Sequence, residues 1–168
     1  VIYGTGKTPE QIISIVDVMR RNGQKSILIT RLSSESAEAI KTLSTYDLDY
    51  HADARIGIIG TMPNPDGIGK IIVATGGTSD IPVAEEAALT AEFLGNEVTR
   101  LYDVGISGLH RLLTHLDDIM SASVIIATTS TSVSVPSKPA RNASPAAIST
   151  ASTSLVASAI RSPVRWRA

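Results

Sequence analysis

Apolar positions recur at helical spacing in two stretches near the start of the sequence. Residues 8–21 carry Ile, Val and Met three or four positions apart, with Thr8 suited to cap a helix and Pro9 to its first turn. The same spacing predicts a second helix from Ser34. Two short apolar runs are typical of strands: 26–30 and 55–60. The first part of the chain therefore predicts a small α/β unit.

The pattern becomes more regular after a turn rich in Pro and Gly at 61–69. Strand-like and helical patterns then alternate, in the order 70–75 (strand), 81–94 (helix), 98–102 (strand), 107–118 (helix) and 123–127 (strand). This alternation favours a right-handed parallel sheet. We therefore predict an α/β fold with an N-terminal lead-in domain over 1–66 and a second domain over 67–127.

Residues 128–168 differ in composition from the rest of the chain. They consist mostly of Ser, Thr, Ala and Pro without a helical period, and no Asp or Glu follows Asp118. Composition of this kind usually fails to fold compactly. We expect an atypical tail in which a frame change or an incomplete reading has replaced the natural ending, with a disordered tail as the alternative.

Charge and composition exclude several classes of function. A net charge of −1 over 168 residues gives no general attraction to nucleic acid or to anionic membranes. The sequence contains no Cys, which excludes disulfides, thiolate metal sites and a cysteine nucleophile within it. No apolar run is long enough for a membrane span, and the first residues lack a signal-peptide pattern, so we expect a cytoplasmic protein.

Candidate binding chemistry lies where two of the predicted parallel strands end, which is where ligands bind in such sheets. Gly76 and Gly77 follow the strand 70–75, and Thr78, Ser79 and Asp80 open the next helix. Glycines let backbone N–H groups approach an anion, and a helix N-terminus favours negative charge. A plain turn in which Ser79 or Asp80 caps the helix explains the same residues, and both interpretations stay open.

A second polar turn, DVGISGLHR at 103–111, follows the neighbouring strand. Arg111 can bind a phosphate through two hydrogen bonds, and His110 can transfer a proton near neutral pH. Gly105 and Gly108 allow a close turn beside them. An isolated His-Arg pair is usually a surface feature of a helix. Two glycine-bearing turns after neighbouring strands favour one shared crevice instead.

These two turns resemble the PurE family, which has a Gly-Ser-x-Ser-Asp turn and a Ser-Ala-His-Arg turn. The stretch GGTSDIPVAEEAALTAEFLGNEVTRLYDVGISGLHRLL more closely resembles the PurE-related LarB family, as do VIYGTGKTPEQI, ILITRLS and the strand SVIIA. The resemblance runs from Val1 to about Ala127. It implies a three-layer, flavodoxin- or Rossmann-like parallel sheet, with 67–127 as a nucleotide-binding domain that is incomplete at its C-terminal side.

LarB proteins carboxylate the pyridinium ring of nicotinic acid adenine dinucleotide and release AMP during biosynthesis of the nickel-pincer nucleotide cofactor. The resemblance implies CO2 or bicarbonate as co-substrate, no tightly bound cofactor, Mg²⁺ as a candidate ion, and a homo-octamer. It implies that His110 is catalytic and that the substrate contacts the following residues: Gly76, Gly77, Thr78, Ser79, Asp80, Gly108 and Arg111. Nucleic acid and membranes are not expected partners.

The sequence departs from this family where the last predicted strand ends. Family members continue there into an Ala-Gly-Met-Glu-Gly turn, whereas this chain reads Ala127-Thr-Thr-Ser-Thr131, and the family's later cysteine has no counterpart. We therefore expect a truncated or altered copy that keeps ligand recognition and lacks synthase activity. The alternatives are a PurE-type carboxylase or mutase acting on aminoimidazole ribonucleotide, and a non-catalytic nucleotide-binding fragment.

Overall fold

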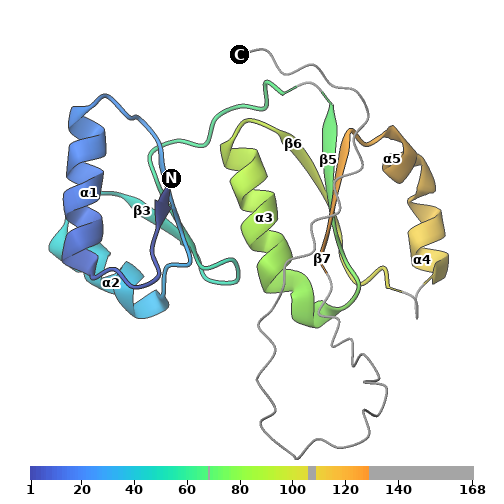
Figure 1. The fold of residues 1–168 in the computed structure, drawn as a ribbon, viewed down its shortest axis with the longest axis horizontal. Helices are drawn as coiled ribbons and strands as arrows, with labels where there is room; N and C mark the ends of the chain where they lie inside the picture. Colours follow the sequence, from blue (N-terminus) through green and yellow to red (C-terminus); the bar gives the residue numbers. More distant parts are fainter. Residues whose placement is uncertain (68, 106–108, 129–168) are drawn as a thin grey trace, which may run out of the picture.

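Two β-sheets lie on either side of one long helix (Figure 1). The computed structural model describes residues 1–67, 69–105 and 109–128. The predictions for Gly108 and for 129–168 lie outside the described residues. The described part is an α/β fold with one mixed and one parallel sheet, so the predicted fold class is confirmed.

The first sheet has four strands in the order β1-β2-β4-β3. Strand β1 pairs parallel to β2, whereas β2 with β4 and β3 with β4 are antiparallel. The elements of this part are β1 (Ile2–Tyr3), α1 (Pro9–Arg21), β2 (Ile27–Thr30), α2 (Ser34–Leu43), β3 (Leu48–His51) and β4 (Ile56–Ile59). The sequence analysis predicted both helices, β2 and β4, but missed β1 and β3.

The two helices of this part begin at side-chain caps. Thr8 and Gln11 form a capping box in which each side chain bonds the other residue's backbone N–H, and Pro9 is the first helical residue. The predicted start of α1 is therefore confirmed. Ser33 caps α2 by accepting a hydrogen bond from the backbone N–H of Ser36.

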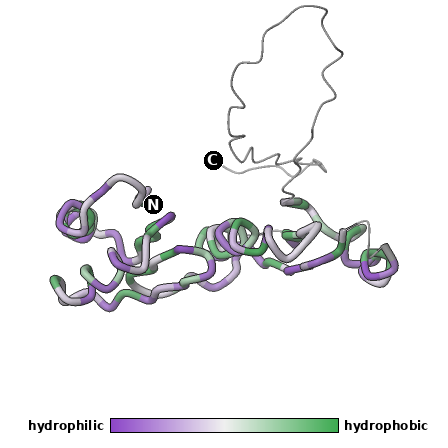
Figure 2. The backbone as a smooth tube through the Cα atoms, turned by 90° about the horizontal axis from the view of Figure 1, so that it is seen from below, coloured by the Kyte–Doolittle hydropathy of each residue, from purple (hydrophilic) through white to green (hydrophobic). Residues whose placement is uncertain are grey.

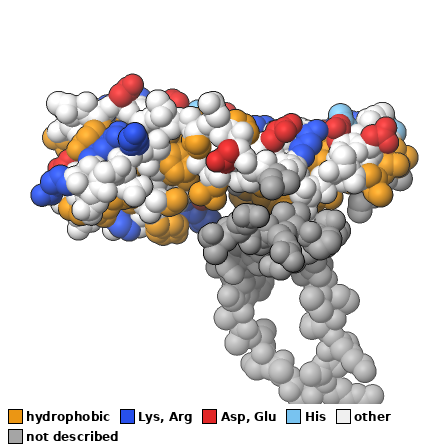
Figure 3. Space-filling model, turned by 90° about the horizontal axis from the view of Figure 1, so that it is seen from above, with side chains coloured by type: hydrophobic (Ala, Val, Ile, Leu, Met, Phe, Trp, Pro, Cys, Tyr) orange, Lys and Arg blue, Asp and Glu red, His pale blue; other side chains and the backbone are white. Residues whose placement is uncertain are grey.

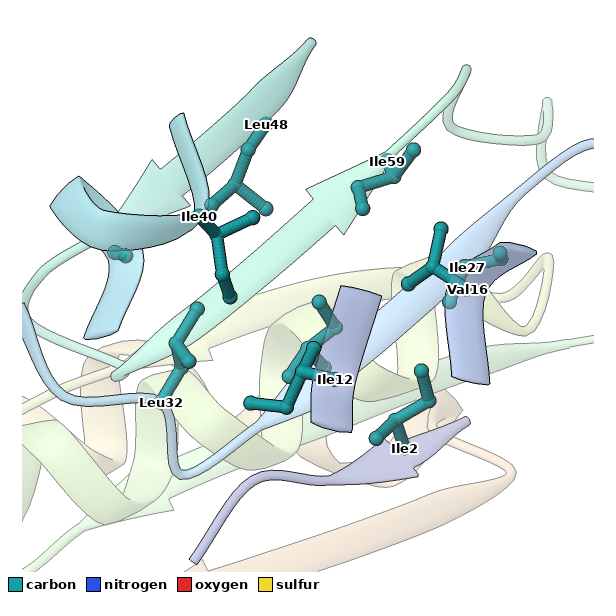
Figure 4. Packing of buried hydrophobic residues seen from close by; sticks show 10 residues of the cluster. Ile2, Ile12, Val16, Ile27, Leu32, Ile40, Leu48 and Ile59 are labelled. Atoms are coloured by element: carbon teal, nitrogen blue, oxygen red, sulfur yellow. The ribbon is translucent and has the colours of Figure 1, made fainter. Parts of the chain in front are cut away.

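Both faces of the first sheet are buried. On one face, Ile12 and Val16 of α1 and Ile40 of α2 pack against Ile27 and Ile59 (Figure 4). The strand residues that alternate with these point to the opposite face, as the twofold period of a strand requires. There they contact a helix that belongs to the second part of the chain, in a cluster of Leu28, Ala54, Ile56, Ile58 and Leu89.

That helix is α3 (Ile81–Phe93), and it is covered on two sides. Leu89 and Phe93 face the first sheet, whereas Ala84 and Ala88 pack on Val73 of the second sheet. An ion pair between Arg31 and Glu86, 3.3 Å apart, joins the two parts as well. A helix that is apolar on most of its surface is typical of this buried position.

The second sheet is entirely parallel, with the order β6-β5-β7. Its strands are β5 (Lys70–Thr75), β6 (Glu97–Leu101) and β7 (Val124–Thr128). All three predicted strands and the helix between β5 and β6 are confirmed. Strand β7 extends one residue beyond its predicted end, because Thr128 pairs with Thr75.

The prediction of one helix over 107–118 is wrong. The structure has two short helices, α4 (Leu109–Thr114) and α5 (Leu116–Ser121). His115 separates them: its N–H bonds the oxygen of Leu112, and its own oxygen accepts from Ile119. Asp117 and Asp118 then stand in the first turn of a new helix, where acidic side chains are favourable.

The layers follow one another along the long axis of the molecule. Figure 1 shows α1 and α2, the first sheet, α3, the second sheet, and then α4 and α5. Figure 2, turned by 90°, shows the same succession with hydrophobic positions gathered around α3. The predicted domain boundary at 66/67 lies in the connection between β4 and β5.

Candidate functional site

The carboxyl end of β5 carries the first of the two predicted turns. Thr75, the last residue of the strand, is only 1% exposed. Gly76 and Gly77 follow it, and Thr78–Asp80 forms a 3-10 turn (η1) that leads directly into α3. The chain therefore reverses within a few residues, which the two glycines permit.

The turn after β6 is tied to this strand end by hydrogen bonds to Thr75. The backbone N–H of Asp103 donates to the Thr75 hydroxyl at 3.0 Å, and the N–H of Val104 donates to the Thr75 carbonyl at 3.0 Å. Gly105 then lies directly against Gly76: a Cβ at Gly105 would be 2.2 Å from the Gly76 carbonyl oxygen. The structure thus brings the two predicted turns together.

Strand β7 contributes a third neighbour. The carbonyl of Thr128 accepts a hydrogen bond from the N–H of Gly76 at 3.3 Å, and its hydroxyl donates to the Ala74 carbonyl at 3.4 Å. Thr128 is 7% exposed. Sequence analysis did not single out Thr75 or Thr128, because Thr is common in strands and their shared feature is visible only once β5 and β7 are paired.

Arg111 lies on α4 and forms an ion pair with the carboxylate of Asp103. The side chains of both residues are about half exposed. His110 is also exposed, on the same short helix. The structure therefore connects Arg111 to the strand ends through Asp103, whereas no such connection is described for His110.

The residues of the 3-10 turn differ in exposure. Thr78 and Ser79 are exposed, whereas Asp80 is 7% exposed. Asp80 stands at the N-cap position of α3, but its side chain makes no capping hydrogen bond, and none is made at the start of η1 either. The prediction that Asp80 caps the helix is therefore wrong: its backbone is helical, with φ −91° and ψ −7°, instead of the extended conformation of a capping residue.

Gly77 leaves space beside the turn. A Cβ added to Gly77 would meet no atom within 4 Å, and its φ of −153° is extended backbone that any residue can adopt. Neither packing nor backbone strain therefore requires Gly at this position. Gly105, in contrast, is required by its contact with Gly76.

Polar contacts between α3 and β6 anchor the second turn. The Tyr102 hydroxyl donates to Glu85 at 2.6 Å, and burial together with this carboxylate raises the pKa of Tyr102 far above its ordinary value. Arg100 bonds both Glu92 and Glu85, and the bonds to Glu92 raise its pKa further. These contacts hold the end of β6, directly before Asp103, against α3.

The rest of the described structure has fewer features of a binding site than the ends of β5 and β6. A cavity of about 420 Å³ lies between the β3–β4 hairpin and α3, lined by residues that include His51, Asp53, Glu85 and Arg100. No group of three or more His, Asp or Glu residues that could hold a metal occurs in the described part. Figure 3 shows acidic, basic and hydrophobic side chains interspersed on the face it draws. None of the described helices has the length and apolar content needed to cross a membrane.

Comparison with known proteins identifies the family. Residues 1–61 match the LarB/PurE-like N-terminal domain. The uncharacterized protein MJ0165 of Methanocaldococcus jannaschii is 38% identical over 130 residues, which cover 74% of this chain and 50% of that protein. The chain thus spans about half the length of the curated relative it matches. With this domain in its first 61 residues, the chain belongs to a LarB/PurE-related family.

Proposed function

We propose that the carboxyl ends of β5 and β6 bind a phosphate-bearing nucleotide. One observation carries this proposal: the two glycine-bearing turns meet, through Thr75 with Asp103 and through Gly76 with Gly105. Arg111 adds a guanidinium group beside this junction. Ligands of open parallel sheets bind beyond the carboxyl ends of the strands, and an Arg fork matches the oxygens of phosphate.

Family membership supports nicotinic acid adenine dinucleotide as the ligand. Ser79 and Asp80 would contact its ribose or phosphate, with Arg111 on a second phosphate oxygen and His110 at the edge of the same pocket. The 168 residues contain no Cys, so the covalent step of ring carboxylation has no nucleophile among them. Carboxylation by CO2 or bicarbonate, any role of Mg²⁺ and a homo-octamer stay predictions of the resemblance.

Titration calorimetry of the full chain tests this proposal. Nicotinic acid adenine dinucleotide should bind, and Arg111→Ala should weaken binding at least a few-fold because a charge-assisted contact is lost. Arg21→Ala is the matched control, since Arg21 lies on α1 and donates to the Asp17 carbonyl. Unchanged affinity in Arg111→Ala would contradict the assignment of Arg111. Tighter binding of aminoimidazole ribonucleotide would favour the PurE-type alternative.

A further inference from the structure

Asp103 has a backbone conformation that its residue type does not favour. Its φ is +57°, in the left-handed region, at the point where β6 has ended and the turn begins. That conformation is unfavourable for a residue with a Cβ, whereas Gly adopts it freely. Asp is among the residues that tolerate it best. Gly would nevertheless fit the backbone better, so the carboxylate at this position calls for an explanation.

The surroundings of Asp103 explain why a carboxylate is present at this position. Its N–H is fixed by the hydroxyl of Thr75, which is almost completely buried, and its neighbour Val104 is fixed by the Thr75 carbonyl. The backbone of Asp103 is thereby held at the end of β5. Its carboxylate reaches out from this fixed point to the guanidinium of Arg111.

Among the described residues, Asp103 is the contact that holds the side chain of Arg111. Arg111 lies on α4, a helix of six residues, and its side chain is 47% exposed. A long flexible side chain of this kind loses rotamer freedom when it binds a ligand, unless a neighbour already holds it. An exposed ion pair adds little to folding stability. The pair is therefore better suited to orienting Arg111 than to stabilising the fold.

We propose that Asp103 is a positioning residue, which holds the guanidinium of Arg111 next to the Gly76–Gly77 turn for contact with a phosphate group. This inference rests on the proposed function for the identity of the ligand. The claim that Asp103 orients Arg111 can be tested without any ligand. Thr75 fixes Asp103, Asp103 orients Arg111, and Arg111 contacts the phosphate. Asp103 itself does not contact the ligand.

The variant Asp103→Gly distinguishes orientation from backbone strain. It removes the carboxylate and relieves the left-handed conformation, so a purely structural role predicts unchanged or improved behaviour. Side-chain NMR of the ¹⁵N-labelled full chain measures the order of the Arg111 Nε–H group. This order should fall in Asp103→Gly, fall less in Asp103→Asn, which keeps a hydrogen-bond acceptor, and stay unchanged in the control Asp117→Asn. Equal order of Arg111 in wild type and Asp103→Gly would overturn the inference.

Binding measurements then test whether the orientation of Arg111 by Asp103 affects the affinity for the nucleotide. Asp103→Gly should weaken binding of nicotinic acid adenine dinucleotide by up to about five-fold, the upper end of the range given by the coupling energies of exposed ion pairs. In an Arg111→Ala background the same change should have no further effect. Equal or tighter binding in Asp103→Gly, or the same loss without Arg111, would contradict positioning. If wild type binds no nucleotide, the proposed function falls, and the NMR order of Arg111 alone decides the role of Asp103.

Discussion

At the scale of single residues, two glycines in the same site have opposite structural roles. Gly105 touches the Gly76 carbonyl so closely that no side chain fits, whereas Gly77 borders open space with an extended backbone. The sequence placed both in glycine-bearing turns but could not separate them, because the distinction depends on which backbone crosses the end of β5. Thr75 was overlooked for the same reason, since its partner Asp103 is distant in the chain.

Gly105→Ala should therefore damage the site and the fold together. The added Cβ would lie 2.2 Å from the Gly76 oxygen, and relieving this overlap requires the two turns to move apart. We expect a loss of about 1–3 kcal/mol in the free energy of unfolding, typical of overpacking. Chemical denaturation measures this, and a variant as stable as wild type would contradict the close contact.

Gly77→Ala should preserve stability and weaken ligand binding. Nothing within 4 Å of the new Cβ opposes it, so its unfolding midpoint should match that of wild type. A nucleotide phosphate that approaches the backbone here would collide with the methyl group. Calorimetry on the folded variant would reject this placement of the ligand if the affinity stayed the same.

At the scale of elements, capping chemistry explains where the prediction succeeded. The Thr8-Pro9 pattern predicted the start of α1, and the structure adds Gln11, which completes a capping box with Thr8. Strand β3 was missed because Leu48–His51 is an edge strand with a single buried residue, Leu48. The division between α4 and α5 was missed because apolar spacing continues across His115. The pair Asp117 and Asp118, which lies in the first turn of α5, fits an exposed face of one continuous helix equally well.

Thr8→Ala should destabilise α1 and, through it, the core of the first sheet. The change removes the hydroxyl that accepts the Gln11 N–H, and loss of an N-cap costs about 1 kcal/mol. Thr5→Ala, at an exposed position in the preceding turn, is the control. Thermal unfolding should show a lower Tm for Thr8→Ala alone; equal Tm values would mean that the cap contributes nothing.

The contact of α5 with β5 should depend on pH. The ammonium group of Lys70 bonds Asp118 at 3.0 Å and lowers the pKa of that carboxyl below its usual 3.8. A lowered pKa in the folded state stabilises the protein above the unfolded pKa, and this contribution disappears as pH falls through the folded pKa. The difference in Tm between wild type and Asp118→Asn should therefore be present at neutral pH and shrink below pH 3.8. A difference that persists at lower pH would assign the effect to another cause.

At the scale of the whole molecule, α3 joins the two sheets into one packed unit. Its residues Leu89 and Phe93 contact the first sheet, and Ala84 and Ala88 contact the second. The sequence predicted a parallel sheet and a small lead-in as successive parts of the chain. It did not predict that one helix would serve as core for both, because helical periodicity indicates an apolar face but not its partners.

Leu89→Ala should therefore destabilise both sheets together. Leu89 is 8% exposed in the cluster with Leu28, Ile56 and Ile58, and truncation of a buried Leu costs about 2–5 kcal/mol. Hydrogen exchange should show lower protection at amides of both β2 and β5. Leu94→Ala, at a position 63% exposed, should change neither. Lower protection in β2 alone would contradict the shared core.

The most direct test of the account is an NMR titration of the ¹⁵N-labelled full chain with nicotinic acid adenine dinucleotide. If the nucleotide binds at the ends of β5 and β6, the amide signals of Gly76, Gly77, Ser79 and Asp103 should shift in proportion to occupancy, together with the Arg111 side chain. Shifts confined to the cavity beside His51 and Arg100, or no shifts at saturating ligand, would contradict it.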